Sequence, residues 1–84
     1  MEQFETGMMA QSKSGHDAGK VYVITKVEEA YVYLVDGKVR TLDKPKKKKK
    51  KHVQLIKESF DIQGATDVDI KRWIKIWNKE DNQN

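Results

Sequence analysis

The chain has 84 residues, of which 36 % are charged, and its formal net charge at pH 7 is +4. A chain of this length forms one domain with a small core, and because it contains no cysteine, disulfide frameworks and thiolate metal sites are excluded. Seven lysines fall within residues 44–52, whereas residues 1–43 hold five Lys and Arg against seven Asp and Glu, and residues 53–84 hold five against six, so one basic segment interrupts a mildly acidic chain.

The N-terminal residues 1–6 are mostly polar, and we expect them to be flexible. Residues 1–5 lack a basic segment followed by an apolar run, so they do not predict a secretory signal. Every apolar run is far shorter than the ~20 residues that span a bilayer. We therefore expect a soluble, cytoplasmic protein.

Three strands are predicted in the first half of the chain. Residues 7–11 predict a short strand. Residues 20–27 and 30–35 are dominated by β-branched and aromatic residues, which favour extended structure. Glu28 and Glu29 form the tight connection between these two strands.

The middle of the chain predicts a hairpin followed by an interruption. Asp36 and Gly37 suit a type I′ turn, whose twist matches that of paired strands. Residues 38–42 alternate charged and apolar, which predicts a half-buried strand. The lysine-rich residues 44–52 then interrupt regular structure, and residues 53–56 predict a closing strand.

The C-terminal segment changes from strand to helix periodicity. Thr66 and Asp69 have the spacing of a capping box, with Asp in place of Glu. We therefore predict an amphipathic helix over residues 67–79, joined to the strands by a linker at 57–66. Its apolar residues, spaced mostly by three and four, are Val68, Ile70, Trp73, Ile74 and Trp77.

Short strands followed by one helix predict a mainly β fold, a small β-barrel of four to five strands with a C-terminal α-helix. Closure is favoured in a protein of this size because it removes exposed strand edges. The barrel is predicted over residues 7–56, with the lysine-rich insert at 44–52.

The segment from Ser12 to Ile24 has two glycines, Gly15 and Gly19, four residues apart, followed by an alternating apolar strand. This pattern resembles the KOW domain, the SH3-like barrel of several ribosomal proteins and transcription elongation factors. The likeness extends to residues 36–40 and 44–52. The resemblance implies an SH3-like barrel that binds RNA, in particular ribosomal RNA, with the glycine loop as an RNA-contacting edge.

The lysine run at residues 46–51 is the strongest functional signal. Like charges repel, so the run alone is expected to be extended, mobile and solvated. Along an RNA backbone it becomes a sequence-independent phosphate clamp. The alternatives are a solvated linker, a nuclear-localisation sequence or a tether to anionic lipid, and we favour nucleic acid.

In the glycine loop, Gly15 and Gly19 allow the backbone to approach a phosphate closely, while neighbouring basic residues supply charge. The alternative is a plain turn. The candidate RNA-binding residues are those of the glycine loop, the basic residues after the hairpin turn and the lysine segment: Lys13, Gly15, His16, Gly19, Lys20, Lys38, Arg40, Lys44, Lys46, Lys47, Lys48, Lys49, Lys50, Lys51 and His52.

The aromatic residues have two readings each. Tyr22, Tyr31 and Tyr33 either stack on unpaired bases or fill the core, and core is favoured for most of them. Trp73 and Trp77 either cover an open end of the barrel, which we favour, or dock a partner protein. Lys71, Arg72 and Lys75, which lie beside them, are further candidates for an RNA surface.

Catalysis and metal binding are not predicted. His16 and His52 lack a third ligand at metal spacing, and no nucleophile triad or phosphate-binding loop is present. We predict a monomeric RNA-binding protein that is not an enzyme and has no cofactor, small-molecule substrate or membrane partner. Its predicted partner is ribosomal RNA, and ribosomal proteins are a further candidate. The alternatives are a protein-interaction module that uses Trp73 and Trp77, or a non-specific nucleic-acid-binding protein such as an architectural DNA-binding protein.

Overall fold

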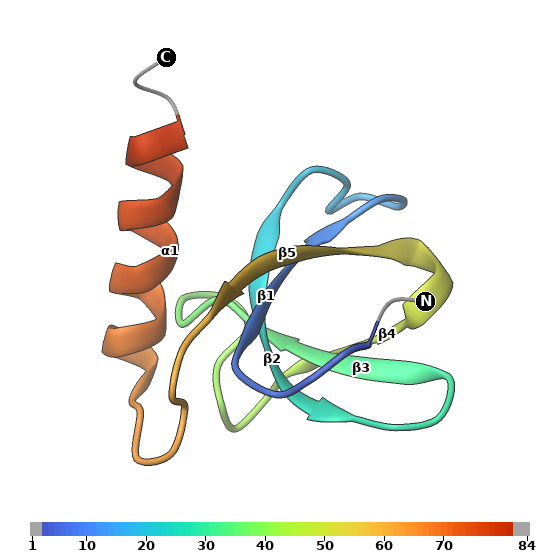
Figure 1. The fold of residues 1–84 in the computed structure, drawn as a ribbon, viewed down its shortest axis with the longest axis horizontal. Helices are drawn as coiled ribbons and strands as arrows, with labels where there is room; N and C mark the ends of the chain where they lie inside the picture. Colours follow the sequence, from blue (N-terminus) through green and yellow to red (C-terminus); the bar gives the residue numbers. More distant parts are fainter. Residues whose placement is uncertain (1–2, 82–84) are drawn as a thin grey trace.

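The computed structural model describes residues 3–81, which form five β-strands, one turn of 3-10 helix and a C-terminal α-helix (Figure 1). In chain order these elements are β1 Met8–Ser12, β2 Val21–Val27, β3 Tyr31–Val35, β4 Lys46–Lys49, η1 Lys50–His52, β5 Val53–Ser59 and α1 Asp67–Asp81. The strands make one antiparallel sheet in the order β4-β3-β2-β1-β5. The prediction of a mainly β fold with a C-terminal helix is confirmed, while residues 1–2 of the predicted flexible N-terminus lie outside the described residues.

Strand β2 is buried on both of its faces, which explains its nearly uninterrupted apolar sequence. Val21 and Val23 belong to a core cluster that includes residues of helix α1, and Tyr22 and Ile24 belong to a second cluster on the other face of the sheet. Successive side chains of a strand point to opposite faces. One central strand therefore serves both halves of the core.

Helix α1 packs on the first core cluster through Ile70 and Ile74, which are 0 % and 9 % exposed. Its N-terminus is capped as predicted, because Asp69 N donates to Thr66 Oγ1 at 3.2 Å and Thr66 N donates to Asp69 Oδ2 at 3.0 Å. The hydrogen bond from Thr66 N lowers the pKa of Asp69. The helix begins at Asp67, as predicted, and continues to Asp81.

The two tryptophans pack against the first core cluster as partly buried side chains, so the part of the favoured prediction that gives them a role in packing is confirmed. Trp73 stacks on Phe60, with ring centroids 4.6 Å apart and the planes 3° from parallel. Both Trp73 and Trp77 remain partly exposed. They therefore seal the outer margin of the contact between helix and sheet, and Ile70 and Ile74 form its centre.

The strand predicted over residues 38–42 is wrong. The chain does reverse after Asp36 and Gly37, and both of their N–H groups donate to Arg40 O, at 2.8 and 3.0 Å. The predicted type I′ turn is wrong, however, because it needs positive φ at both residues and only Gly37 has it. The following residues form a loop in which Val39 is 77 % exposed, so the alternating pattern does not mark a buried face there. The loop is instead held by Asp36 Oδ1, which accepts hydrogen bonds from two backbone N–H groups downstream.

The prediction that the lysine run interrupts regular structure is also wrong. Lys46–Lys49 is strand β4, paired in antiparallel register with β3 so that Lys46 lies opposite Leu34 and Lys48 opposite Val32. Alternate lysines point to opposite faces of the strand. This alternation separates neighbouring charges, and the carboxylate of Asp17 pairs with Lys46 and Lys48 on the inner face.

Strands β4 and β5 are the two edges of the sheet, and yet only η1 separates them in the chain. The sheet is therefore strongly curved, and β5 passes across the fold towards the turn that leaves β4 (Figure 1). Strand β5 ends at Ser59, so the linker predicted from residue 57 begins three residues too early. No helix within residues 3–81 is long and apolar enough to cross a membrane.

Candidate nucleic-acid interface

Two of the predicted RNA-binding lysines, Lys46 and Lys48, are partly buried and pair with an internal acid. Their ammonium groups lie 2.9 Å and 2.8 Å from the two carboxylate oxygens of Asp17, a residue that is only 5 % exposed. Ser12 Oγ and Tyr22 OH also donate to this carboxylate, at 2.9 and 3.2 Å. The lysines thus neutralise a buried acid and hold β4 against the loop between β1 and β2.

The ionisation of this network follows from its contacts. Burial alone raises the pKa of Asp17, but the hydrogen bonds from Lys48, Lys46 and Ser12 outweigh that effect and hold the pKa well below its usual 3.8. Burial beside this carboxylate raises the pKa of Tyr22 to about 12. At neutral pH Asp17 is therefore a carboxylate and Tyr22 is a neutral phenol.

The glycine loop is a closed turn. Gly15 and Gly19 adopt φ of 88° and 90°, as their predicted role in the turn requires. The N–H of Gly19 donates to Ser12 O at 2.8 Å and the N–H of Lys20 donates to Asp17 O at 2.9 Å, so these groups are already occupied. The loop consequently offers the exposed side chains Lys13, His16 and Lys20 to a partner.

The outward-facing side chains of β4 meet two aromatic rings of β3. Lys47 Nζ lies 4.4 Å from the ring centroid of Tyr31 and 6.0 Å from that of Tyr33, and Lys49 lies directly opposite Tyr31 in the strand register. We call Tyr31, Tyr33, Lys47 and Lys49 the outer face of β4. Both tyrosines are partly exposed, so the preference for core was right for Tyr22 and wrong for these two.

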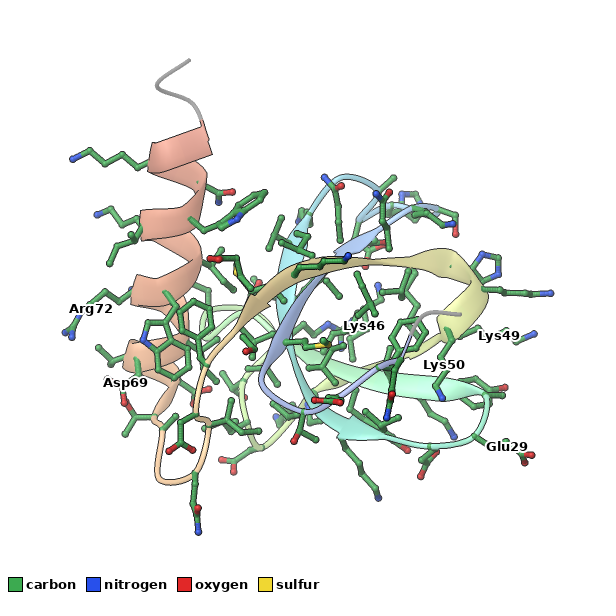
Figure 2. All side chains as sticks on the ribbon, in the orientation of Figure 1. Glu29, Lys46, Lys49, Lys50, Asp69 and Arg72 are labelled. Atoms are coloured by element: carbon green, nitrogen blue, oxygen red, sulfur yellow. The ribbon has the colours of Figure 1, made fainter. Side chains whose placement is uncertain are left out.

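The turn η1 continues the basic surface beyond β4. Figure 2 shows Lys49 and Lys50 on the outside of the fold and Lys46 inside the curved sheet. Lys50 Nζ lies 5.4 Å from the ring centroid of Phe4, and Lys51 is exposed. His52 Nδ1 is 3.0 Å from Ser14 Oγ, which fixes this histidine against the glycine loop.

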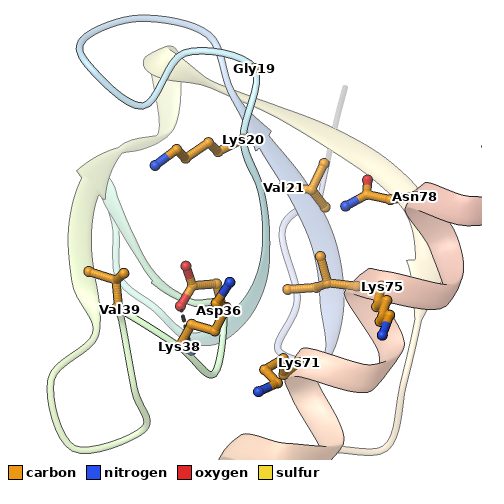
Figure 3. A pocket seen from close by; sticks show the side chains of 10 residues that line it. Gly19, Lys20, Val21, Asp36, Lys38, Val39, Lys71, Lys75 and Asn78 are labelled. Atoms are coloured by element: carbon orange, nitrogen blue, oxygen red, sulfur yellow. Dashed lines mark hydrogen bonds between the residues drawn. The ribbon is translucent and has the colours of Figure 1, made fainter.

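A second basic region lies between helix α1 and the loops at residues 13–20 and 36–40. It is a groove of about 750 Å³ (Figure 3). Three of the predicted residues, Gly19, Lys20 and Lys38, line it, and the helix contributes two lysines. The lining residues are Gly19, Lys20, Val21, Asp36, Lys38, Val39, Lys71, Ile74, Lys75 and Asn78.

The predicted set is therefore divided. The exposed residues Lys47, Lys49 and Lys51 follow β4 and η1, and Lys20 and Lys38 line the groove. Of the other predicted residues, Arg40 and Lys44 lie in the loop between β3 and β4, outside the residues that line the groove.

Asp17, which pairs with both Lys46 and Lys48, is not among the site residues predicted from the sequence. The visible signal was a lone acid in a loop with three basic residues, but its lysine partners lie about thirty positions later, 31 in the case of Lys48. Within residues 3–81 no group of three or more potential metal ligands is found.

Gly37 fixes the position of the helix beside the groove. Its φ is +80°, and a Cβ built there would lie 2.3 Å from Asp67 O and 2.9 Å from Lys71 N. Only glycine fits so close to the helix backbone without a shift of one element. The loop at residues 36–40 therefore rests directly on the first turns of α1.

We expect Gly37→Ala to reduce the free energy of unfolding by about 2–4 kcal/mol, from the cost of positive φ and from overpacking. Gly64→Ala is the matched control, because Gly64 has a φ of +79° and nothing lies within 4 Å of its added Cβ. Only the backbone cost of about 1–2 kcal/mol applies to this variant. Urea denaturation measures both, and equal losses would show that the helix does not press on Gly37.

Comparison of the sequence with known proteins finds no matching family model and no curated protein of significant similarity.

Proposed function

We propose that the protein binds RNA through the outer face of β4, with η1 extending the contact. The observation that carries this proposal is the alternation of exposed lysines with two partly exposed tyrosines on neighbouring strands. Lysines contact phosphates without reading sequence. Aromatic rings stack on unpaired bases at ~1–3 kcal/mol per base, so the two together suit single-stranded segments of a folded RNA.

We further propose that the curved sheet is an SH3-like barrel of the KOW type, with ribosomal RNA as the partner. The three-residue connection between the two edge strands supports closure, since it keeps β4 and β5 close at one end. A contact from β4 to the loop after β1 supports it too, because Lys48 Nζ donates to Ser14 O at 2.8 Å. The choice of ribosomal RNA rests on the sequence resemblance alone.

The number of lysines available for RNA is smaller than the run suggests. Lys46 and Lys48 are committed to Asp17. Lys47 makes only a long 4.0 Å contact with Glu28 Oε1, and it remains together with Lys49, Lys50 and Lys51. Replacing all six lysines would therefore unfold β4 and would confuse loss of structure with loss of binding. A test of binding must leave the two inner lysines in place.

The test is the affinity of the double variant Lys47→Gln, Lys49→Gln for a single-stranded RNA, measured by fluorescence anisotropy at several salt concentrations. Each lost phosphate contact on single-stranded RNA removes about 0.7 from the slope of log K against log salt, so the slope should fall by about 1.4. By the same relation the affinity at about 0.1 M salt should drop by roughly 10- to 30-fold. The control is the double variant Lys57→Gln, Lys79→Gln, which removes the same charge from exposed positions on β5 and at the end of α1.

Equal losses in the two variants would contradict the proposal, because they would reflect net charge rather than a site. Tighter binding to duplex DNA than to RNA in competition would favour an architectural DNA-binding protein. RNA binding absent from the unsubstituted protein would favour the protein-interaction alternative at Trp73 and Trp77.

A further inference from the structure

The groove between α1 and the loops is suited to a ligand by its size. Its volume of about 750 Å³ lies within the range of roughly 300–1,000 Å³ typical of small-ligand sites. One wall comes from the loops before β2 and after β3 through Lys20 and Lys38, and the other comes from the helix through Lys71 and Lys75 (Figure 3). A molecule in the groove would meet positive charge on both sides.

These four groove lysines differ from the lysines near Asp17 and Glu28. Among the described side chains, ion pairs are formed by Lys26, Lys46, Lys47 and Lys48, and none by a groove lysine. The one carboxylate that lines the groove, Asp36, accepts hydrogen bonds from Lys38 N at 2.9 Å and Arg40 N at 2.8 Å. Its role is to shape the loop, and the lining keeps a strong excess of positive charge that attracts anions.

Between the lysines the lining is apolar. Val21 and Ile74 are both 9 % exposed at the base of the groove, and Val39 is 77 % exposed at its margin. The Asn78 side chain adds a hydrogen-bond donor and an acceptor. An apolar surface, a polar amide and flanking cations match the flat face, the edge and the phosphates of a nucleotide.

We propose that the groove takes one unpaired nucleotide of the bound RNA, with its base on Val39 and Ile74 and its flanking phosphates against the groove lysines. This inference rests on the proposed function, but it concerns a site separate from the outer face of β4. Cations on both walls favour a continuous strand that enters and leaves the groove. A free nucleotide offers the same chemistry, and the experiment below distinguishes the two.

The first experiment follows methyl resonances by NMR during titration with a single-stranded RNA heptamer and, separately, with ATP. We expect the heptamer to shift the methyl resonances of Ile74, Val21 and Val39 along with the ring resonances of Tyr31 and Tyr33.

Shifts of the tyrosine resonances alone would overturn the groove proposal and leave RNA binding by β4 in place. Shifts of the groove methyl groups alone would support the groove and contradict the proposed role of β4. Groove shifts with ATP but not with the heptamer would overturn the proposal in favour of a free nucleotide, and no shift with either probe would overturn both proposals.

The second experiment tests separately the positive charge of the groove lysines and the apolar surface between them. The double variant Lys71→Gln, Lys75→Gln should bind the heptamer roughly 10- to 30-fold more weakly at about 0.1 M salt. The variant Lys57→Gln, Lys79→Gln serves again as the control.

Val39→Asp should also weaken binding of the heptamer by at least tenfold. Its control is Val68→Asp, which should change binding by less than about threefold, because Val68 is 59 % exposed on the helix and lies outside the groove. Each variant is checked for an unchanged melting temperature, and equal effects of the two aspartates would overturn the proposal.

Discussion

Replacing Asp17 by Asn is expected to reduce the free energy of unfolding by about 3 kcal/mol, a large fraction of the stability of a domain of this size. The substitution keeps the shape of the side chain but removes the negative charge that pairs with both Lys46 and Lys48. Two ammonium groups, 26 % and 11 % exposed at their side chains, would then face one another without compensation. Breaking a buried ion pair from one side typically costs 3–5 kcal/mol.

The loss should appear first in β4. This strand lies at the edge of the sheet and pairs only with β3 in the described part of the chain. In the Asp17→Asn variant, amide hydrogen exchange should therefore speed up at Lys46–Lys49 before it does so in β1 or β2.

Urea denaturation measures the global effect. It compares Asp17→Asn with Asp43→Asn, an exposed control in the loop before β4. The control should lie within about 0.5 kcal/mol of the unsubstituted protein.

The pH dependence of this effect has a defined sign. The folded protein lowers the pKa of Asp17 below its usual 3.8, so the carboxylate stabilises the fold in full above that value. The contribution is lost as the pH falls below 3.8 towards the lowered pKa of the folded state. The difference between the unsubstituted protein and Asp17→Asn should therefore be constant from pH 7 to pH 5 and should shrink below pH 4. A difference that grows on acidification would contradict this account of the network.

Patterns among neighbouring residues were sufficient to predict most of the strands and the helix. The β-branched residues of β2 and β3 and the reciprocal spacing of Thr66 and Asp69 depend only on near neighbours. Strand β4 was missed because a run of one charge favours solvation, and its stability comes from Asp17, 31 positions before Lys48. A contact at that separation is not visible in the local pattern of either segment.

The candidate site was likewise predictable only in part from neighbouring residues. That the lysine segment carries exposed cations was predictable from composition, but the separation of inner from outer lysines required the register with β3. The groove was not predicted as a unit. Lys71 and Lys75 fall on the polar side of the predicted helix, yet their position opposite Lys20 and Lys38 depends on the close contact between Gly37 and the backbone of Asp67.

The second large effect is expected for Ile70→Ala, which should reduce the free energy of unfolding by about 3–4 kcal/mol. Ile70 is 0 % exposed and packs with Met9, Val23 and Val35 at the centre of the contact between helix and sheet. Truncation removes apolar contacts and leaves a cavity in close-packed surroundings. Val68→Ala is the control on the same helix, since Val68 is 59 % exposed and should change stability by less than about 0.5 kcal/mol.

The same variant tests whether helix and sheet unfold together. The only two tryptophans of the chain, Trp73 and Trp77, are on α1, so their fluorescence reports on the helix, and amide exchange in β1 and β2 reports on the sheet. Because an undocked helix would expose Met9, Val23 and Val35 to water, we expect the two probes to give coincident transitions that shift equally in Ile70→Ala. A tryptophan transition that moves alone would show that the sheet is stable without α1. In that case the groove would open and close with the helix, and RNA bound there would stabilise α1 selectively.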